Sequence, residues 1–319
     1  MLVHVDTDIG GDPDDACALA MLLGWPGIDI TGITTNLEAD GRRAACAGYV
    51  LKLAGRENIP IAAGANASMT DLRRFEPTFG DERHWPEPFD ARPSPAGAAL
   101  DLLAASIARD ATIVAIGGLT NLALLEVMRP GVLRTARIVA MAGWLAPPSA
   151  GLPQWGPDMD FNVQCDPRAA EIVAVAADDL TLVTLPVTMR AHLRARDLVP
   201  LRSSGPIGAL LARQSEVNAS DANMSDLART HPALPDDLVN FHWDPVTCAV
   251  AAGWAGATIE SKRLRVTRRD GVVVFEEGDD GDDGHDVRVV TDLDIAAFTD
   301  VWLSAVQAAD AAAIANRAG

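Results

Sequence analysis

The stretch VDTDIGGDPDD at residues 5–15 decides the fold prediction. It follows an apolar run at 2–5 that is typical of a buried strand, and it leads into a helix-like run at 14–24. Five of its residues are aspartates, all within ten positions of one another. In open α/β sheets, ligands bind beyond the carboxyl ends of the strands. A functional site is therefore expected at this strand-to-helix turn.

The alternation of strand and helix continues outward from this turn. Further strands are expected at 28–34, 59–62, 112–116, 138–141 and 180–185, and further helices at 41–54, 96–109, 119–128 and 167–176. This order predicts an α/β fold with a mainly parallel, doubly wound (Rossmann-like) sheet that carries helices on both faces.

The last third of the chain has a different pattern. Residues 205–250 are expected to be mostly helical, and 291–317 to form a final helix. Short apolar runs at 262–266, 272–276 and 287–290 predict a small C-terminal β ribbon. Because no repeat or linker divides the chain, we expect a single domain over residues 1–319.

Composition limits the classes of function. The formal net charge of -18 disfavours a nucleic-acid partner, because an acidic surface repels phosphates. No run reaches the roughly 20 apolar residues of a membrane span, and the N-terminus lacks the features of a signal peptide. The cysteines are far apart and show no zinc-binding spacing: Cys17, Cys46, Cys165 and Cys248. We expect a cytoplasmic protein with reduced thiols and a small neutral ligand or a cation as its partner.

The crowded aspartates at 6–15 favour a metal site. Neighbouring carboxylates repel one another unless a cation neutralises them, and Ca²⁺ accepts oxygen ligands in flexible geometry. The alternative is helix capping, in which Asp12 or Asp14 stabilises the N-terminus of the following helix. Capping accounts for one or two of the five aspartates, so the metal site is the preferred interpretation.

Several motifs together resemble one family. They are Asp6-Thr7-Asp8 followed by Asp14-Asp15, Gly32-Ile33-Thr34-Thr35, Ile59 to Gly64, Ile116-Gly117-Gly118-Leu119-Thr120-Asn121, Met141-Ala142-Gly143, Asp160-Phe161-Asn162, Asp166-Pro167 and Asp244-Pro245. In this order they resemble the nucleoside hydrolase (inosine-uridine preferring N-ribohydrolase) family over residues 2–255. The resemblance implies hydrolysis of the bond between ribose and base.

The resemblance also implies a calcium centre. Its ligands would be the carboxylates of Asp8, Asp15 and Asp244 and the backbone carbonyl of Ile116. Asp244 before Pro245 would otherwise be a helix cap. Asp8 would also be the general base, since members of this family use the matching aspartate in that role.

The expected ribose-binding residues are Asp14, Asp160 and Asn162. The first of these comes from the acidic stretch, and the other two match the acidic residue and asparagine of the family's ribose segment. Contacts to the 2′-hydroxyl would make the enzyme selective for ribosides, because a deoxy substrate leaves buried partners unpaired.

The expected base-binding residues are Trp243, Trp85 and His242. Pyrimidine-cleaving members have histidine immediately before the late aspartate, and purine-preferring members have tryptophan there, as this chain does. Stacking on Trp243 therefore predicts purine preference. An indole is no acid at neutral pH, so His242 and His84 are considered as proton donors.

Two features depart from the family pattern. The first loop is two residues longer than usual and contains Asp12. The asparagine that the family often carries after the second strand is not matched at Ala39, and Asn36 is displaced from that position. In addition, the region 66–95 does not match the family's usual histidine-glycine loop, which bears on the choice of base.

Other functions remain open from the sequence. The enzyme could cleave pyrimidine or modified nucleosides, or the chain could be a non-catalytic nucleoside-binding protein of the same fold. An aspartate-dependent phosphatase also begins with Asp-x-Asp after a strand, but it leaves the later motifs unexplained. The resemblance further implies a homodimer or homotetramer.

Overall fold

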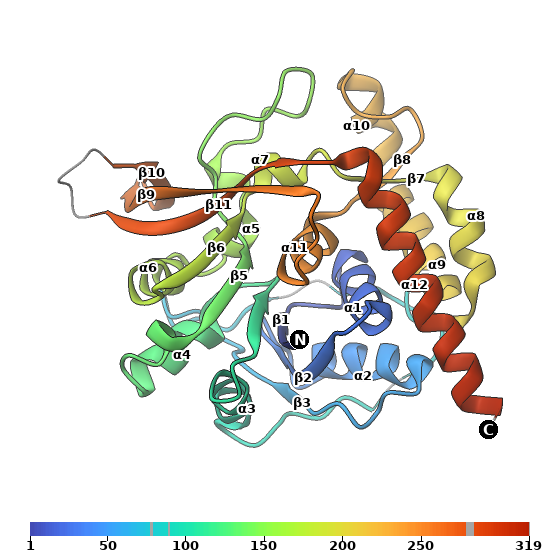
Figure 1. Ribbon diagram of the computed structural model, residues 1–319, viewed down its shortest axis with the longest axis horizontal. Helices are drawn as coiled ribbons and strands as arrows, with labels where there is room; N and C mark the ends of the chain where they lie inside the picture. Colours follow the sequence, from blue (N-terminus) through green and yellow to red (C-terminus); the bar gives the residue numbers. More distant parts are fainter. Residues whose placement is uncertain (77–78, 89, 279–283, 319) are drawn as a thin grey trace.

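The core of the fold is a parallel sheet in the order β3-β2-β1-β4-β5-β6 (Figure 1). The computed structural model describes residues 1–76, 79–88, 90–278 and 284–318. The strands are β1 (Leu2–Thr7), β2 (Asp29–Thr35), β3 (Ile61–Ala63), β4 (Thr112–Ala115), β5 (Arg137–Met141) and β6 (Asp179–Val183). Their residues are mostly buried, as expected for strands covered on both faces. The predicted doubly wound α/β fold is confirmed.

The strand order reverses between β1 and β4. From β1 the chain adds β2 and then β3 on one side, and it returns to add β4, β5 and β6 on the other. The loops that leave β1 and β4 therefore diverge and open a crevice between them. Such a reversal is the usual ligand-binding place in open α/β sheets.

Two groups of helices cover the sheet. Alternation along β4 shows the two faces, because Val114 packs in one hydrophobic cluster while Ile113 and Ala115 pack in the other. The first cluster includes α1 (Asp14–Gly24), α2 (Arg42–Ala54), α11 (Trp243–Ala251) and α12 (Ile295–Ala318), and the second includes α3 (Ala98–Ile107), α4 (Thr120–Met128) and α6 (Pro167–Ala176). Figure 1 shows α12 running beside α1, α8 and α9.

Further helices and turns connect this framework. They are α5 (Phe161–Gln164), α7 (Leu185–Thr188), α8 (Ala195–Ser204), α9 (Pro206–Asp221), α10 (Met224–Thr230) and the 3₁₀ turns Leu133–Thr135 and Pro157–Met159. Within the described ranges, no helix is both long and apolar enough to cross a bilayer.

The three predicted C-terminal strands form an antiparallel ribbon, and this ribbon also extends the main sheet. They are β9 (Ala257–Arg269), β10 (Val272–Glu277) and β11 (His285–Leu293). β11 pairs in parallel with β6 through Arg288 and Val289, which gives the nine-stranded order β10-β9-β11-β6-β5-β4-β1-β2-β3. The alternate residues Val287 and Val289 of β11 are buried, so β11 contributes to the core.

A second, two-stranded sheet was not predicted. β7 (His192–Arg194) pairs antiparallel with β8 (Leu238–Phe241), and β8 lies inside the region 205–250 that was expected to be mostly helical. β8 is only four residues long, and its partner is distant in the sequence. Local periodicity cannot reveal such a pair.

Candidate active site

A cavity of about 560 Å³ lies where β1, β4 and β5 end. Its walls come from the acidic loop between β1 and α1 (residues 8–13), the first turn of α1, α2, the segment 155–165 and the start of α11. The lining residues are Asp8, Gly11, Asp12, Asp14, Asp15, Leu37, Arg43, Phe75, Glu76, Ile116, Met141, Trp155, Met159, Asp160, Phe161, Asn162, Cys165, Leu185, Trp243 and Asp244. The cavity thus occupies the crevice at the reversal of strand order.

Three buried carboxylates meet at one point of this cavity. Asp14 and Asp15 stand in the first turn of α1 and Asp244 in the first turn of α11, and one oxygen from each lies within 4.8 Å of the others. Burial raises the pKa of all three carboxyls well above the ordinary value, and repulsion among the carboxylates raises it further. Two helix N-termini oppose this effect in part. The group is suited to hold a cation.

Asp8 stands directly after β1 and lines the same cavity. Burial raises its pKa, whereas the nearby Arg43 guanidinium lowers it. The turn after β4 comes very close, since a Cβ at Gly117 would lie 2.8 Å from the backbone nitrogen and Oδ1 of Asp8. Only glycine allows this approach. Ile116, immediately before it, lines the cavity.

Hydrogen bonds beneath the cavity fix the ends of these strands. Asp6 accepts hydrogen bonds from Thr34 (2.5 Å), Asn121 (2.7 Å) and Asn36 (3.1 Å), and burial raises its pKa to about 6. Asn36 also accepts from the backbone N–H of Gly118 at 2.9 Å. Asp6 and Asn36 therefore link β1, β2 and the turn after β4, and they do not line the cavity.

Asp15 is oriented from the same strand. The Thr7 hydroxyl donates to the Asp15 carboxylate, and the Thr7 oxygen accepts from the backbone N–H of Ile9 at 3.1 Å. Thr7 thus explains why a threonine stands between the first two aspartates of the signature.

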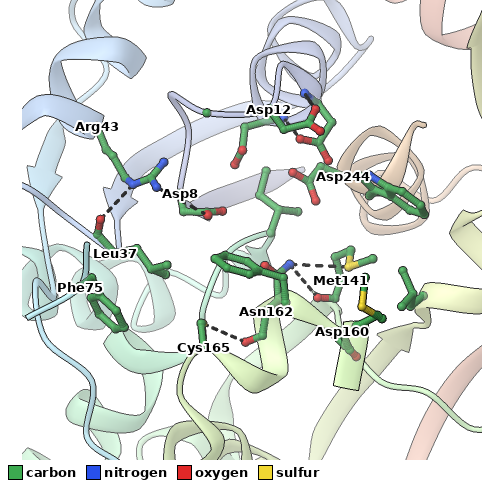
Figure 2. Close-up of a pocket in the computed structure, with 18 of the residues that line it drawn as sticks. Asp8, Asp12, Leu37, Arg43, Phe75, Met141, Asp160, Asn162, Cys165 and Asp244 are labelled. Carbon is green, nitrogen blue, oxygen red and sulfur yellow. Dashed lines mark hydrogen bonds and ion pairs between the residues drawn. The ribbon is translucent and has the colours of Figure 1, made fainter. Parts of the chain in front are cut away.

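Two of the three predicted ribose residues, Asp160 and Asn162, line the opposite wall, whereas Asp14 belongs to the carboxylate group. Figure 2 shows Asp160 and Asn162 on the side of the cavity that faces Asp8, Asp12 and Asp244. Asp160 caps α5 and accepts from the backbone N–H groups of Gly143 (2.5 Å) and Val163 (3.4 Å), while burial raises its pKa to about 7. Asn162 donates to the carbonyl of Met141 at 3.1 Å.

Aromatic rings form a further wall. Trp243 stacks on Phe241 with ring centroids 4.3 Å apart, and its ring centroid is 6.0 Å from that of Trp155. Trp243 and Trp155 both line the cavity. The structure therefore places the predicted Trp243 where a planar group can stack.

The other two predicted base-binding residues lie away from the cavity. Trp85 is buried edge-on against Tyr49 and donates to the carbonyl of Gly10 at 3.4 Å. His242 is buried against Trp302, with ring centroids 4.6 Å apart, and burial lowers its pKa to about 3. Both rings are buried in the core, and neither is among the residues that line the cavity.

Residue His84, considered as an alternative acid, lies against Asp81. Its Nδ1 is 3.3 Å from the Asp81 carboxylate, and its side chain is largely buried. It does not appear in the cavity wall.

Two contacts of the site were not predicted. Arg43 of α2 reaches Asp8, and Asn240 of β8 donates to the Asp12 carboxylate at 2.6 Å. A signal for Arg43 was present, because it shares the apolar helix face of Cys46, Ala47 and Val50 at spacings of three, four and seven. A charged residue on a buried face needs a partner. No comparable signal pointed to Asn240.

Comparisons with known proteins identify the family of the chain. A family model described as inosine-uridine preferring nucleoside hydrolase matches residues 3–300. The pyrimidine-specific ribonucleoside hydrolase RihA of Citrobacter koseri is 34% identical over 227 residues, which are 66% of this chain and 70% of that protein. RihA of Salmonella paratyphi C is 33% identical over 222 residues, 66% of this chain and 68% of that protein.

Solved structures share the fold. A plant nucleoside hydrolase, PpNRh1, superposes with a TM-score of 0.80 at 23% identity, covering 96% of this chain and 98% of that one. A purine-preferring ribonucleoside hydrolase from Gardnerella vaginalis gives 0.80 at 20% identity, covering 98% and 100%. Because the family match spans most of its length, the chain belongs to the inosine-uridine preferring nucleoside hydrolase family and is an N-ribohydrolase.

Proposed function

We propose that this enzyme hydrolyses purine ribonucleosides with a Ca²⁺ held by the carboxylates of Asp8, Asp15 and Asp244 and the carbonyl of Ile116. The observation that carries the proposal is the meeting of buried Asp14, Asp15 and Asp244 oxygens within 4.8 Å. This group contains two of the proposed carboxylate ligands, and the third, Asp8, lines the same cavity. These are the hard oxygen donors that Ca²⁺ prefers.

The charge of the cavity fits a divalent cation. Many carboxylates line the wall, and Arg43 is its one basic residue in the part of the chain that the structure describes. Burial and repulsion make the ionised forms of Asp14, Asp15 and Asp244 costly without a counter-charge. When bound, Ca²⁺ would neutralise the carboxylates and make a neighbouring water more acidic.

Asp8 is the proposed general base. Its carboxylate faces the cavity beside the cation site and is not fully buried, with 14% of the side chain exposed. It would take a proton from water as the water oxygen bonds to C1′ of the ribose. The bond between C1′ and the base nitrogen breaks, its electron pair leaves with the base, and the sugar passes through an oxocarbenium-like state.

The ribose would lie between the two walls. Asp14 on one side and Asp160 and Asn162 on the other are placed to contact its hydroxyls across the cavity. The pKa of Asp160, raised to about 7, allows its carboxyl to accept or donate near neutrality. These contacts predict poor turnover of 2′-deoxynucleosides.

Purine preference rests on the aromatic wall. Trp243, backed by Phe241 and next to Trp155, offers a broad face to a fused ring. The buried, neutral His242 is not positioned to protonate the leaving base. Stacking with protonation of the purine from solvent is the mechanism that these residues support.

A second candidate is pyrimidine hydrolysis. The curated relatives at 34% and 33% identity are both named pyrimidine-specific. Free-base release from inosine, adenosine, guanosine, uridine and cytidine, measured with Ca²⁺ and with chelator, tests both candidates. The proposal expects higher kcat/KM for purines and loss of turnover with chelator. Faster cleavage of uridine and cytidine would contradict purine preference and favour the second candidate. Turnover that survives chelation would contradict the proposed role of Ca²⁺.

A further inference from the structure

Asp12 is a cavity carboxylate for which the cation and sugar contacts provide no role. It lines the cavity from the loop that precedes α1, and its side chain is solvent-exposed. It is not among the three carboxylates that meet within 4.8 Å. Figure 2 shows it near the acidic group, opposite Asn162.

Asn240 holds Asp12 as an acceptor. The Asn240 amide Nδ2 donates to Asp12 Oδ1 at 2.6 Å, and the backbone N–H of Asp14 donates to the same oxygen at 3.1 Å. Asn240 is buried, and its Oδ1 has no partner in residues 1–76, 79–88, 90–278 and 284–318. Reversing this amide would bring its oxygen against the carboxylate. The orientation of Asn240 therefore suits an acceptor at Asp12.

The same short segment places the aromatic wall. Asn240 is in β8, and Trp243 begins α11 three residues later. Phe241 between them stacks on Trp243 at 4.3 Å. One segment therefore fixes both the amide that holds Asp12 and the ring on which a base would stack, and Asp12 and Trp243 line the same cavity.

We propose that Asp12 selects bases that carry a ring N–H on the edge facing it. An ionised carboxylate only accepts hydrogen bonds. Hypoxanthine and guanine offer N1–H and uracil offers N3–H, whereas adenine and cytosine present a lone pair at the equivalent ring nitrogen. A lone pair facing a carboxylate is repelled, and the acceptor is left unpaired.

This inference rests on the proposed placement of the base beside Trp243, but it does not depend on purine preference. Inosine, guanosine and uridine share the ring N–H, so the selection applies to either class of base. Methylation of that nitrogen removes the donor and leaves the remaining hydrogen-bonding groups in place. Inosine with 1-methylinosine and uridine with 3-methyluridine are therefore matched substrate pairs.

The test compares the wild type with Asp12→Asn and Asn240→Ala, using both substrate pairs, adenosine and p-nitrophenyl riboside. Asp12→Asn is expected to lower kcat/KM for inosine by about 10- to 100-fold, the range for a lost hydrogen bond to a charged group. It should leave 1-methylinosine and the nitrophenyl riboside unchanged. The new amide would keep its oxygen toward Asn240 and turn its NH₂ to the base, which should raise adenosine turnover relative to inosine.

Asn240→Ala frees the carboxylate to rotate, and it should raise KM for inosine more than it lowers kcat. Asp300→Asn, an exposed charge removal on α12, is the matched control and should change nothing. An equal loss on every substrate with Asp12→Asn would place Asp12 in the cation or sugar site and overturn the inference. An unchanged ratio of inosine to 1-methylinosine would also overturn it. Absence of base release by the wild type with Ca²⁺ would instead reject the proposed function.

Discussion

The Nη2 of Arg43 lies 4.0 Å from Oδ2 of Asp8 inside the cavity wall (Figure 2). Arg43 is almost fully buried and is fixed by two further contacts, since its Nε donates to the carbonyl of Leu37 and its Nη1 to that of Ile9, each at 3.0 Å. A helix from one part of the chain thus supplies a rigid positive charge to the carboxylate that follows β1. This charge opposes the rise in the pKa of Asp8 that burial causes.

Replacement of Arg43 should reduce both turnover and stability. Arg43→Met removes the charge beside Asp8 and leaves the carbonyls of Ile9 and Leu37 unpaired, so we expect kcat to fall about 10- to 100-fold and the free energy of unfolding to fall by about 1–3 kcal/mol. Arg43→Lys should recover only part of the turnover and part of the stability, because a lysine ammonium cannot reproduce the hydrogen bonds of the planar guanidinium. Steady-state kinetics and urea unfolding measure the two effects.

The neighbouring Arg42 is the matched control for this experiment. Arg42 is exposed and lies over the Phe79 ring at 4.2 Å, outside the cavity wall. Arg42→Met should therefore retain wild-type kinetics. If it lowers kcat as much as Arg43→Met does, the effect comes from the surface charge of α2 and not from contact with Asp8.

Replacement of Asp8 should remove proton abstraction without removing the cavity. Asp8→Asn keeps the volume and one oxygen, so nucleoside binding should change less than turnover. We expect kcat to fall by about 10²–10⁴-fold, the usual contribution of a general base. Single-turnover kinetics at saturating substrate measure the chemical step. A fall confined to KM would assign Asp8 to binding alone.

The sequence predicted helix boundaries well where local signals fix them. The expected bounds of α1 and α6 match the structure, since Asp14 and Asp15 favour the first turn of α1 and Pro167 favours that of α6. The β7–β8 pair was missed because its hydrogen bonds depend on tertiary contact. The pairing of β11 with β6 was missed because alternation reveals strands but not their partners.

The site could be predicted in part, where sequence motifs mark its residues. Four of the five aspartates of the acidic stretch line one cavity with Asp244, as do Asp160, Asn162 and Trp243. Trp85 and His242 do not, because an aromatic residue near a motif can pack in the core as readily as in a site. The contact of Asn240 with Asp12 spans 228 residues, so no local pattern could reveal it.

The buried carboxylates should make the protein less stable when no cation is bound. Asp244→Asn removes one charge from the group with Asp14 and Asp15, so in chelator its Tm should exceed that of the wild type. Addition of Ca²⁺ should raise the wild-type Tm through binding to the folded state, and it should raise that of the variant much less. Calorimetry with and without Ca²⁺ measures the Tm of both proteins. An equal rise in Tm with Ca²⁺ in both would show that Asp244 does not bind the cation.

Loss of the Trp243 ring should affect substrates according to their leaving group. Trp243→Ala should lower kcat/KM for inosine much more than for p-nitrophenyl riboside, whose leaving group needs no protonation. Trp243→Phe should keep part of the stacking, so its kcat/KM for inosine should lie between those of the wild type and Trp243→Ala. Equal losses on both substrates would mean that the indole only shapes the cavity, and leaving-group activation by Trp243 would be wrong.

The pH dependence of stability should report the buried His4. Its Nδ1 lies 2.9 Å from the Ser106 hydroxyl and its Nε2 lies 3.0 Å from that of Thr34, and burial lowers its pKa from 6.5 to about 3. Thr34 donates to Asp6, so its oxygen is free to accept from Nε2–H of a neutral imidazole. The Ser106 hydroxyl then donates to Nδ1, and every group in this chain is paired without a charge on His4.

The sign of the effect follows from proton binding. Between pH 6.5 and about 3 the unfolded chain binds a proton at His4 that the folded protein does not, so stability falls as the pH falls through this window. When the pH falls from 7.5 to 5.5, His4 should lower the free energy of unfolding by about 1.4 kcal/mol, because pH 5.5 lies one unit below the pKa of an unfolded histidine. Other buried groups titrate as well, so the measured quantity is a difference: His4→Gln should lose about 1.4 kcal/mol less than the wild type over this interval. Urea unfolding at both pH values provides the comparison, and parallel losses in the two proteins would show that His4 is already protonated in the fold or titrates alike in both states.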